Sequence, residues 1–422
     1  MYTRFTTDYC KFTIEKQGSS TYTKMSFPSH CGRYTEIETE NFIFQFNLNR
    51  EILRAKGKSQ DWGHPHEWLK RTQGNDWVYY STGGYTGVFE ATGEYYLPNF
   101  QYPTNSILGG HPFTCNEITD VIKNWHDEIK HIKKHSNHSP ALLQDFLNDA
   151  VENTPEKLEK RAEKLFEIIE GRISVLPPDA RHVDYNLIPL TISKGCLYKC
   201  RFCKVKNNTP FTEKTIEEIQ NKIGQLKQFY DNDLPNYNSI FLGEHDALQA
   251  NPGLILSSIN EAYRSFNFTH SYLKGSNTFL FGSVTALLNC PDWFFKELGE
   301  TEGNTYINIG LESADAETLD KLGKPITPEL VAESFSRIQE INNNYPTIEI
   351  TANFLMDEDL PANHYPSIEK LIRDSQTHTR PKGTIYFSPL QFGQASRKHL
   401  FTFNRLKIMS RFPTYLYIIQ RL

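Results

Sequence analysis

"TISKGCLYKCRFCKVKNN", residues 191 to 208, brings three of the seven cysteines of the chain within eight positions. The spacing is Cys196-x3-Cys200-x2-Cys203, and it follows the apolar run 186–193. Such a run is typical of a buried parallel strand, and the loop after such a strand lies at the sheet edge where α/β proteins bind ligands. The stretch therefore predicts an α/β fold with chemistry at the end of its first strand.

Composition narrows the kind of chemistry. The chain has 422 residues and a net charge of -5, with 45 basic and 50 acidic residues mixed along it, so neither nucleic acid nor an anionic membrane is indicated as a partner. The first residues lack the apolar core of a secretory signal, and no run approaches the ~18 apolar residues of a membrane span. We therefore expect a cytoplasmic protein, in which a tight cysteine cluster favours metal or redox chemistry over disulfides.

Apolar runs alternate with helix-like stretches after the cysteines. The runs are 186–193, 238–243, 277–284, 305–311, 348–356 and 383–390, and the helical stretches are 213–231, 252–266, 291–300, 315–344 with a break near Pro325, 363–376 and 395–410. Six strand-helix units in series predict parallel strands joined by right-handed crossovers, as an open sheet or an incomplete barrel. The closing stretch 411–422 is compatible with a last strand or with a packing tail.

The chain before the cysteines divides differently. Residues 1–113 are rich in aromatic and turn residues and predict a β-rich domain, with strand-like segments at 35–49 and 76–100 and hairpin turns at Gly83-Gly84 and Gly93. Residues 114–175 predict two or three helices ending near Gly171. The breaker "LPPDARH" (176–182) is the preferred boundary before a core domain at 176–422.

Three cysteines at this spacing restrict the possible metal. A zinc site or a ferredoxin-type cluster would normally use four protein ligands, and no second Cys or His pair stands at a convincing distance. Three thiolates can each bind one iron of a 4Fe-4S cube and leave the fourth iron open to a small molecule. Packing thiols and structural zinc are the alternatives.

Here the sequence resembles a known family. "CLYKCRFC" (196–203) resembles the CxxxCxxC motif of the radical S-adenosylmethionine (radical SAM) superfamily, and the resemblance extends over about 180–410. "FLGEHDAL" (241–248) and "INIGLESADAETLDKLGK" (307–324) stand after later strands, where that family has further motifs. The resemblance implies a partial (β/α)6 radical SAM barrel that uses a 4Fe-4S cluster and S-adenosyl-L-methionine (SAM).

The family assigns the cluster ligands and the first cofactor contact. Carried over residue by residue, it implies that Cys196, Cys200 and Cys203 bind three irons, while the amino and carboxylate groups of SAM chelate the fourth. The backbone of Phe202 would lie near the adenine.

Later motifs would meet the rest of SAM. Gly243-Glu244 stands where the family has a GGE-like motif for the methionine amino group, although one glycine precedes the glutamate here. Glu312 and Ser313 would lie near the ribose or the methionine moiety, and a helix N-cap role is their alternative. His245 and Asp246 would contact substrate or stabilise their own loop.

The expected activity follows from these assignments. The resemblance implies an enzyme that cleaves SAM reductively to a 5'-deoxyadenosyl radical and abstracts hydrogen from an organic substrate, with flavodoxin or ferredoxin as one-electron donor. Residues 291–422 contain no cysteine, which favours a single cluster. Two rivals are a cluster-bearing cofactor-carrier or heme-trafficking protein without radical turnover, and a zinc-stabilised nucleic-acid-binding protein.

Overall fold

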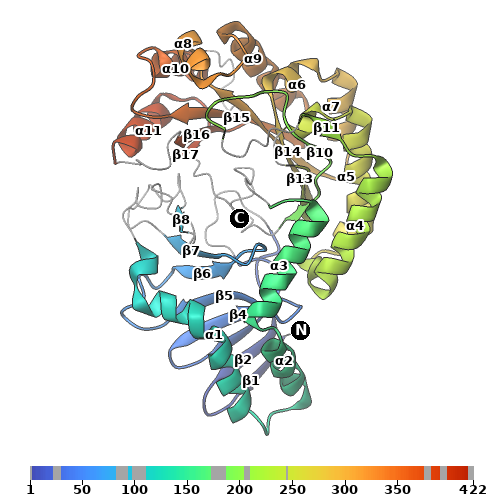
Figure 1. Cartoon of the computed structure of the whole chain (residues 1–422), viewed down its shortest axis with the longest axis vertical. Coiled ribbons are helices and arrows are strands. Elements are labelled where there is room, and N and C mark those ends of the chain that lie inside the picture. Colours follow the sequence, from blue (N-terminus) through green and yellow to red (C-terminus); the bar gives the residue numbers. More distant parts are fainter. Residues whose placement is uncertain are drawn as a thin grey trace.

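The structure is a computed structural model, and its two large sheets lie at opposite ends of the long axis (Figure 1). It describes residues 2–21, 30–81, 94–96, 111–172, 187–203, 210–243, 246–374, 382–389 and 397–416. The hairpin turns predicted at Gly83-Gly84 and Gly93 and the boundary predicted at 176–182 lie outside these residues. Within them, no helix is both long enough and apolar enough to cross a membrane.

The N-terminal sheet has eight strands paired in sequence order, each antiparallel to the next. Segment 35–49 buries one set of apolar side chains, because alternate side chains of a strand face opposite sides of the sheet. The chain also reverses its direction within this segment. The segment, predicted to be strand-like, therefore contributes to two strands. The strands are β1 (Thr3–Thr6), β2 (Lys11–Gln17), β3 (Arg33–Glu38), β4 (Phe42–Phe46), β5 (Ile52–Gly57), β6 (Trp68–Arg71), β7 (Trp77–Ser81) and β8 (Glu94–Tyr96).

Three helices follow, as the 3.6-residue periodicity indicated: α1 (Asn116–His135), α2 (Ala141–Glu152) and α3 (Pro155–Ile169). The apolar faces of α1 and α2 pack on one face of the N-terminal sheet, where Trp125 and Phe146 join Phe44 and Phe46 in a common core. The last turns of α3 instead contribute to the core of the second sheet. Helix α3 thus connects the two cores.

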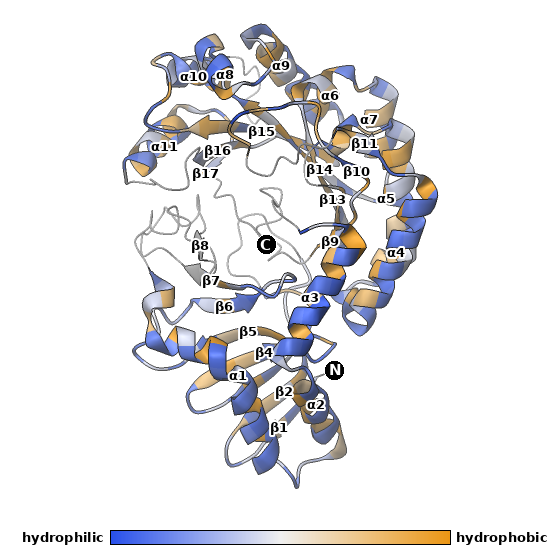
Figure 2. Cartoon of the chain, viewed as in Figure 1, coloured by the Kyte–Doolittle hydropathy of each residue, from blue (hydrophilic) through white to orange (hydrophobic). Residues whose placement is uncertain are grey.

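The second sheet has seven parallel strands in the order β17-β16-β15-β14-β13-β12-β9. Helices pack on its outer side, and Figure 2 shows apolar residues along β15 and polar residues over much of α4. The strands are β9 (Ile188–Pro189), β12 (Ser239–Phe241), β13 (Ser276–Gly282), β14 (Gly303–Glu312), β15 (Ile348–Met356), β16 (Ile385–Pro389) and β17 (Thr414–Leu416). The helices are α4 (Ile216–Tyr230), α5 (Pro252–Phe266), α6 (Val284–Asn289), α7 (Asp292–Gly299), α8 (Ala316–Leu322), α9 (Pro328–Asn344), α10 (His364–Asp374) and α11 (Arg397–Met409).

This architecture confirms the predicted parallel α/β core and refines it in three places. The closing stretch contributes the seventh strand, β17, in parallel register with β16. The apolar run 186–193 divides between β9 in the large sheet and β10 (Ser193–Lys194), which pairs with β11 (Thr212–Glu213). The short helix α6 occupies residues that the sequence assigned to the end of a strand and a connection.

Polar contacts join the two parts of the molecule at the short helix η4 (Asp231–Asn236). The side chain of Asn236 accepts the Arg33 N–H at 2.7 Å and donates to the Arg33 carbonyl at 2.8 Å. Asp233 Oδ1 accepts the Leu48 N–H at 3.0 Å. Gly32 allows this close approach, because a Cβ there would lie 2.4 Å from Asn236 Oδ1.

Asp233→Asn is expected to remove much of the pH dependence of stability. Burial of Asp233 raises its carboxyl pKa to about 7, despite the hydrogen bonds from Leu48 and Asn236 that favour the ionised form. Since an unfolded Asp titrates near ~3.9, the folded state holds a proton that the unfolded state has lost, and stability falls as pH rises between these values. Three pKa units correspond to about 4 kcal/mol.

Urea unfolding at about pH 5 and about pH 8 measures this effect. The wild-type protein should lose about 3 kcal/mol between the two, while Asp233→Asn, whose amide oxygen still accepts both hydrogen bonds, should lose much less. Asp231→Asn is the matched control, because Asp231 is exposed. Equal pH slopes in the wild type and Asp233→Asn would contradict the prediction.

Candidate active site

The three cysteines lie on one loop whose ends are held together. The cysteine loop (195–211) leaves β10 and returns into β11, and these strands pair through Ser193 with Glu213 and Lys194 with Thr212. A further hydrogen bond runs from the Lys214 N–H to the Ile192 carbonyl at 2.9 Å. The structure describes residues 195–203 and 210–211 of the loop. The loop therefore begins at the carboxyl end of the first strand, as expected.

Two contacts hold the cysteine loop over neighbouring strand ends. The hydroxyl of Tyr198 accepts the Thr285 N–H at 3.0 Å and lies 2.5 Å from Thr285 Oγ1, in the first turn of α6 after β13. The Arg201 N–H donates to the Leu322 carbonyl at the end of α8, at 2.9 Å. These contacts place the cysteines above the middle of the parallel sheet.

The three thiols differ in burial but affect one another electrostatically. Cys200 is buried, and Cys196 and Cys203 are partly exposed. Burial raises the pKa of Cys200 to about 11, with smaller contributions from Lys324, which lowers it, and from Glu312 and the other two cysteines, which raise it. Burial also raises the pKa of Cys196. Cys200 therefore lies within electrostatic reach of Cys196 and Cys203.

The described residues contain no group of side chains that could hold a single metal ion. Among the described residues, no three His, Cys, Asp or Glu side chains come close enough to hold one metal ion. Each cysteine of a 4Fe-4S site binds a different iron, so its thiols need not converge on one point. The assignment of Cys196, Cys200 and Cys203 as ligands of such a cluster stays a prediction.

A buried ion pair lies beside the cysteine loop at the end of β14. Glu312 ends this strand with a positive φ of 67°, and the pairing of β14 with β15 shifts register between Gly310 and Glu312. Lys324 Nζ lies 3.2 Å from Glu312 Oε1 and donates to the Gly310 carbonyl at 2.6 Å. Burial opposes the charge of Lys324, but Glu312, Cys200 and Tyr198 together outweigh burial and raise the lysine pKa.

The ion pair is one link in a chain of contacts across the strand ends. On one side, Asn353 of β15 donates to Glu312 Oε2 at 3.3 Å and accepts from Ser388 of β16 at 2.7 Å. On the other, Lys324 Nζ lies 5.5 Å from the ring centroid of Tyr198 in the cysteine loop. Glu312, Asn353 and Ser388 therefore form a polar edge that adjoins the cysteines.

The other residues predicted to bind SAM are partly described. Phe202 is half-buried within the cysteine loop, and Gly243 is buried at the end of β12 with φ +151°. A Cβ on Gly243 would approach Ser193 O to 3.9 Å, so this glycine lies beside the start of the loop. Glu244 and His245 lie outside the described residues. The contacts of Phe202, Gly243, Glu244, Glu312 and Ser313 with SAM stay predictions.

Ser313 and Asp246 make contacts within the protein. The Ser313 hydroxyl lies 2.9 Å from His364 Nδ1 and accepts the Asp315 N–H, while His364 Nε2 lies 2.9 Å from the Leu355 carbonyl. Asp315, rather than Ser313, caps α8 by accepting the Thr318 N–H. Asp246 Oδ1 accepts the N–H of Ser283, the residue that caps α6, at 2.8 Å, which favours its loop-stabilising role.

Sequence reasoning did not single out Lys324, Asn353 or Tyr198. Lys324 closes the motif 307–324 and follows Gly323, the left-handed residue that ends α8. The sequence did contain a signal for Lys324. This lysine directly follows a helix-ending glycine and stands twelve positions after a strand-end glutamate. Asn353 carried a weaker one, because it alternates with apolar residues in β15.

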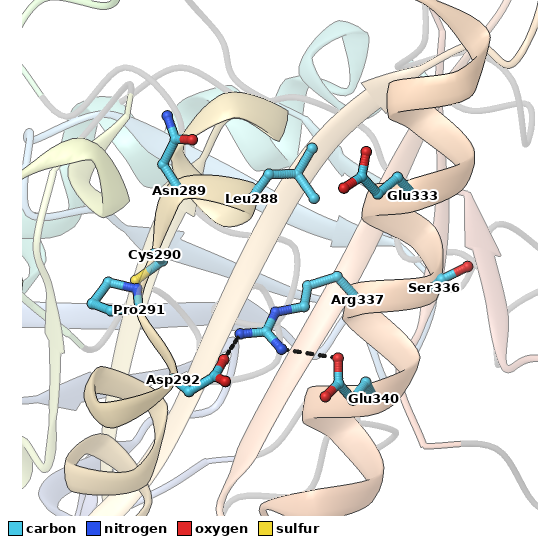
Figure 3. Close-up of a pocket in the computed structure, with 9 residues that line it drawn as sticks. All are labelled: Leu288, Asn289, Cys290, Pro291, Asp292, Glu333, Ser336, Arg337 and Glu340. Carbon is cyan, nitrogen blue, oxygen red and sulfur yellow. Dashed lines mark hydrogen bonds and ion pairs between the residues drawn. The ribbon is translucent and has the colours of Figure 1, made fainter.

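A pocket of about 590 Å³ lies elsewhere, on the outer helices (Figure 3). Its lining includes Arg337 of α9, which pairs with Asp292 of α7 and with Glu340 at 2.9 Å. Cys290, at the end of α6, also lines it. None of the lining residues belongs to the cysteine loop or to the polar edge, so the pocket is separate from the candidate active site.

Gly323→Ala is expected to destabilise the protein by about 1 kcal/mol. Gly323 has φ +64°, and a Cβ would lie 2.9 Å from Arg201 Cγ in the cysteine loop. An L side chain at this position must adopt the unfavourable left-handed conformation, and Arg201 must move to make room for the Cβ. Thermal or urea unfolding checks this.

The same substitution at Gly224 is the control for Gly323→Ala. Gly224 lies in the interior of α4, and a Cβ there would meet nothing within 4 Å. Gly224→Ala should therefore stabilise the protein by about 0.5–1 kcal/mol. A change of the same sign in both variants would contradict the prediction.

The fold and the site together define an α/β protein with a cysteine loop at the carboxyl edge of a parallel, partial-barrel sheet. Residues 190–356 match the family model of the radical SAM superfamily. The matched segment, less than half of the chain, runs from the end of β9 to the end of β15 and marks a radical SAM domain. No protein with a curated description matches the sequence.

Solved structures of radical SAM enzymes are similar to part of the chain. A radical SAM methyltransferase from Sphaerobacter thermophilus shares 12% identity with a TM-score of 0.36, and the match covers 55% of this chain and 65% of that one. Methylornithine synthase (PylB) shares 12% identity with a TM-score of 0.34, over 60% of this chain and 70% of that one. The cobalamin-dependent enzyme OxsB, with cobalamin bound, shares 13% identity with a TM-score of 0.32. That match covers 44% of this chain and 26% of OxsB. The match thus spans less than two thirds of the methyltransferase and about a quarter of OxsB.

Proposed function

We propose that the protein is a radical SAM enzyme that cleaves SAM reductively and abstracts hydrogen from an organic substrate. One observation carries this proposal: the cysteine loop, with its three cysteines within eight positions, lies at the carboxyl end of the first strand of the parallel sheet, at the start of the segment that matches the radical SAM family model. Cys196, Cys200 and Cys203 would bind the 4Fe-4S cluster. A bound cluster supplies the electron that converts SAM to methionine and a 5'-deoxyadenosyl radical.

The role of the protein is then to bind, orient and shield SAM and substrate. The polar edge offers carboxylate and amide groups for ribose hydroxyls or an ammonium, because charge-assisted hydrogen bonds are the stronger kind. Glu312 suits this role, since Lys324 and Asn353 fix its orientation. Gly243 leaves backbone space beside the cysteine loop. Flavodoxin or ferredoxin would deliver the electron.

Anaerobic reconstitution tests the proposal. The protein should bind roughly four iron and four sulfide per chain, the content of one cluster. With dithionite and SAM it should form 5'-deoxyadenosine and methionine. A reconstituted protein that forms no 5'-deoxyadenosine would instead support the rival without radical turnover, a cofactor-carrier or heme-trafficking protein.

The zinc-stabilised nucleic-acid binder is tested by metal content and by salt. Zinc without iron, together with a nucleic-acid affinity that falls steeply as salt rises, would favour that rival. The match of residues 190–356 to the radical SAM family model favours the radical SAM enzyme.

A further inference from the structure

A single glutamate lies at the junction of the helical region, the cysteine loop and the helix after it. Glu170 follows the last residue of α3 and adopts the left-handed conformation, with φ 61° and ψ 38°. Glycine is the usual residue at this position, because a Cβ costs about 1 kcal/mol there. A carboxylate also meets the negative end of the helix dipole. Both effects disfavour Glu170, so its side chain must provide a compensating interaction.

Three lysines provide that interaction. Glu170 Oε1 lies 2.6 Å from Lys214 Nζ and 3.2 Å from Lys222 Nζ, and Oε2 contacts Lys194 Nζ. Burial opposes ionisation of Glu170, but the hydrogen bonds from Lys194, Lys214 and Lys222 lower its pKa to about 2. The carboxylate is therefore charged at any ordinary pH.

The positions of the lysines are informative. Lys194 ends β10 two residues before Cys196, and Lys214 follows the last residue of β11. These two lysines flank the cysteine loop at its two ends. Lys222 belongs to α4, which packs against α3 (Figure 1). One carboxylate therefore joins both ends of the loop to two helices.

This junction matters because the loop is otherwise weakly closed. The pairing of β10 with β11 comprises two residue pairs, and so short a ribbon has little stability by itself. Side-chain exposure is 9% for Lys214 and 5% for Lys222, so without the carboxylate these cations would repel each other with little water to screen them. Removal of the Glu170 charge would therefore drive the ends of the loop away from α3 and from each other.

We propose that Glu170 is a positioning residue for the cysteine loop, through which the helical region 114–175 sets the arrangement of the three thiols. This role rests on the proposed function only for the identity of the cofactor that the loop binds. Among the described residues, the polar contacts of the Glu170 side chain go to the three lysines, so it acts on the thiols through Lys194 and Lys214. The helical region thus has a function in the radical SAM domain that follows it in sequence.

Differential alkylation of the apo-protein tests the arrangement without the cluster. Cys200 and Cys290 are each 8% exposed, so Cys290, on the outer helices, is an internal reference. Glu170→Gln should raise the ratio of Cys200 to Cys290 labelling, measured by mass spectrometry, by about 10-fold, because the loop opens locally. Glu167→Gln is the matched control: it lies one turn earlier in α3 and pairs at the surface with Lys164.

Iron release to a chelator is the second readout, on the reconstituted protein. Glu170→Gln should release iron about 10-fold faster than wild type and Glu167→Gln, in line with other residues that support metal ligands indirectly. Glu170→Gly removes the strain of the left-handed residue as well as the charge. It should lose less stability than Glu170→Gln yet release iron as fast, which separates positioning from global folding.

The outcomes distinguish this role from the proposed function. A raised labelling ratio in a protein that binds no iron even as wild type would reject the radical SAM function and support the positioning role. Iron binding and 5'-deoxyadenosine formation in wild type, with unchanged labelling and iron release in both Glu170 variants, would overturn the positioning role alone.

Discussion

Cys200→Ala is expected to abolish cluster binding and to lower 5'-deoxyadenosine formation at least about 100-fold. Changes in residues that only support metal ligands already cost about 10–100-fold, and Cys200 would bind an iron directly. Its thiol is the most buried of the three, and both Lys324 and Glu312 influence its pKa. Alanine leaves two thiols on the loop, which cannot hold three corners of a cube.

Cys290→Ala is the matched control for this substitution. Cys290 is equally buried, burial raises its pKa to about 12, and it lies at the end of α6 beside the outer pocket (Figure 3). Iron and sulfide content, the visible absorption of the cluster and 5'-deoxyadenosine formation should all stay near wild type. Retention of about four iron by Cys200→Ala would contradict the assignment.

The core of the fold was predictable because its strands are continuously apolar. Run 348–356 matches β15 residue for residue, and stretch 252–266 matches α5. Both are long enough for one periodicity to dominate, and Asn251 caps α5 while Pro252 begins it. The break predicted near Pro325 is also present, since α8 ends at Leu322 and α9 begins at Pro328.

Short elements were less predictable, because they are decided by partners distant in sequence. Six residues form α6, too few for a 3.6-residue period to be visible, and its position depends on contacts of Ser283 with Asp246 and of Thr285 with Tyr198. The run 186–193 continues beside β12 through hydrogen bonds of the Leu190 and Ile192 N–H groups, and its end then pairs with β11 as β10. No local pattern in the run encodes that second partner.

The candidate site shows the same division between local and distant information. The cysteine spacing is local, so the loop could be placed from sequence. The pairing of Glu312 with Lys324 depends on α8 turning the chain back, so that Gly323 brings the lysine to the end of β14. The motif around Glu312 was recognisable, but the tertiary contact that orients its carboxylate was not.

Lys324→Met should lower the free energy of unfolding by about 3 kcal/mol, the lower range for breaking a buried ion pair. The two side chains are 5% and 9% exposed, so the substitution leaves the Glu312 carboxylate buried, with the Asn353 amide as its remaining described partner. Urea unfolding of the apo-protein measures this without the cluster. Lys321→Met, on the exposed side of α8, is the control and should change stability by less than about 0.5 kcal/mol.

The pH dependence of this effect has a definite sign. Because the pKa of Lys324 is raised in the folded state, its stabilising contribution is complete below the unfolded value of ~10.4 and is lost only as pH rises through the folded pKa. The difference between wild type and Lys324→Met should therefore stay constant from about pH 7 to about pH 9. A difference that shrinks within that range would mean that the lysine is not held as a buried cation.

A double substitution separates stability from function. Glu312→Gln with Lys324→Met leaves no unpaired buried charge, and the introduced glutamine amide can still contact Asn353, so most of the lost stability should return. Formation of 5'-deoxyadenosine should stay at least about 10-fold below wild type, because the carboxylate proposed to meet SAM is absent. If activity returned together with stability, the ion pair would serve folding alone, and the polar edge would have to bind SAM through other groups.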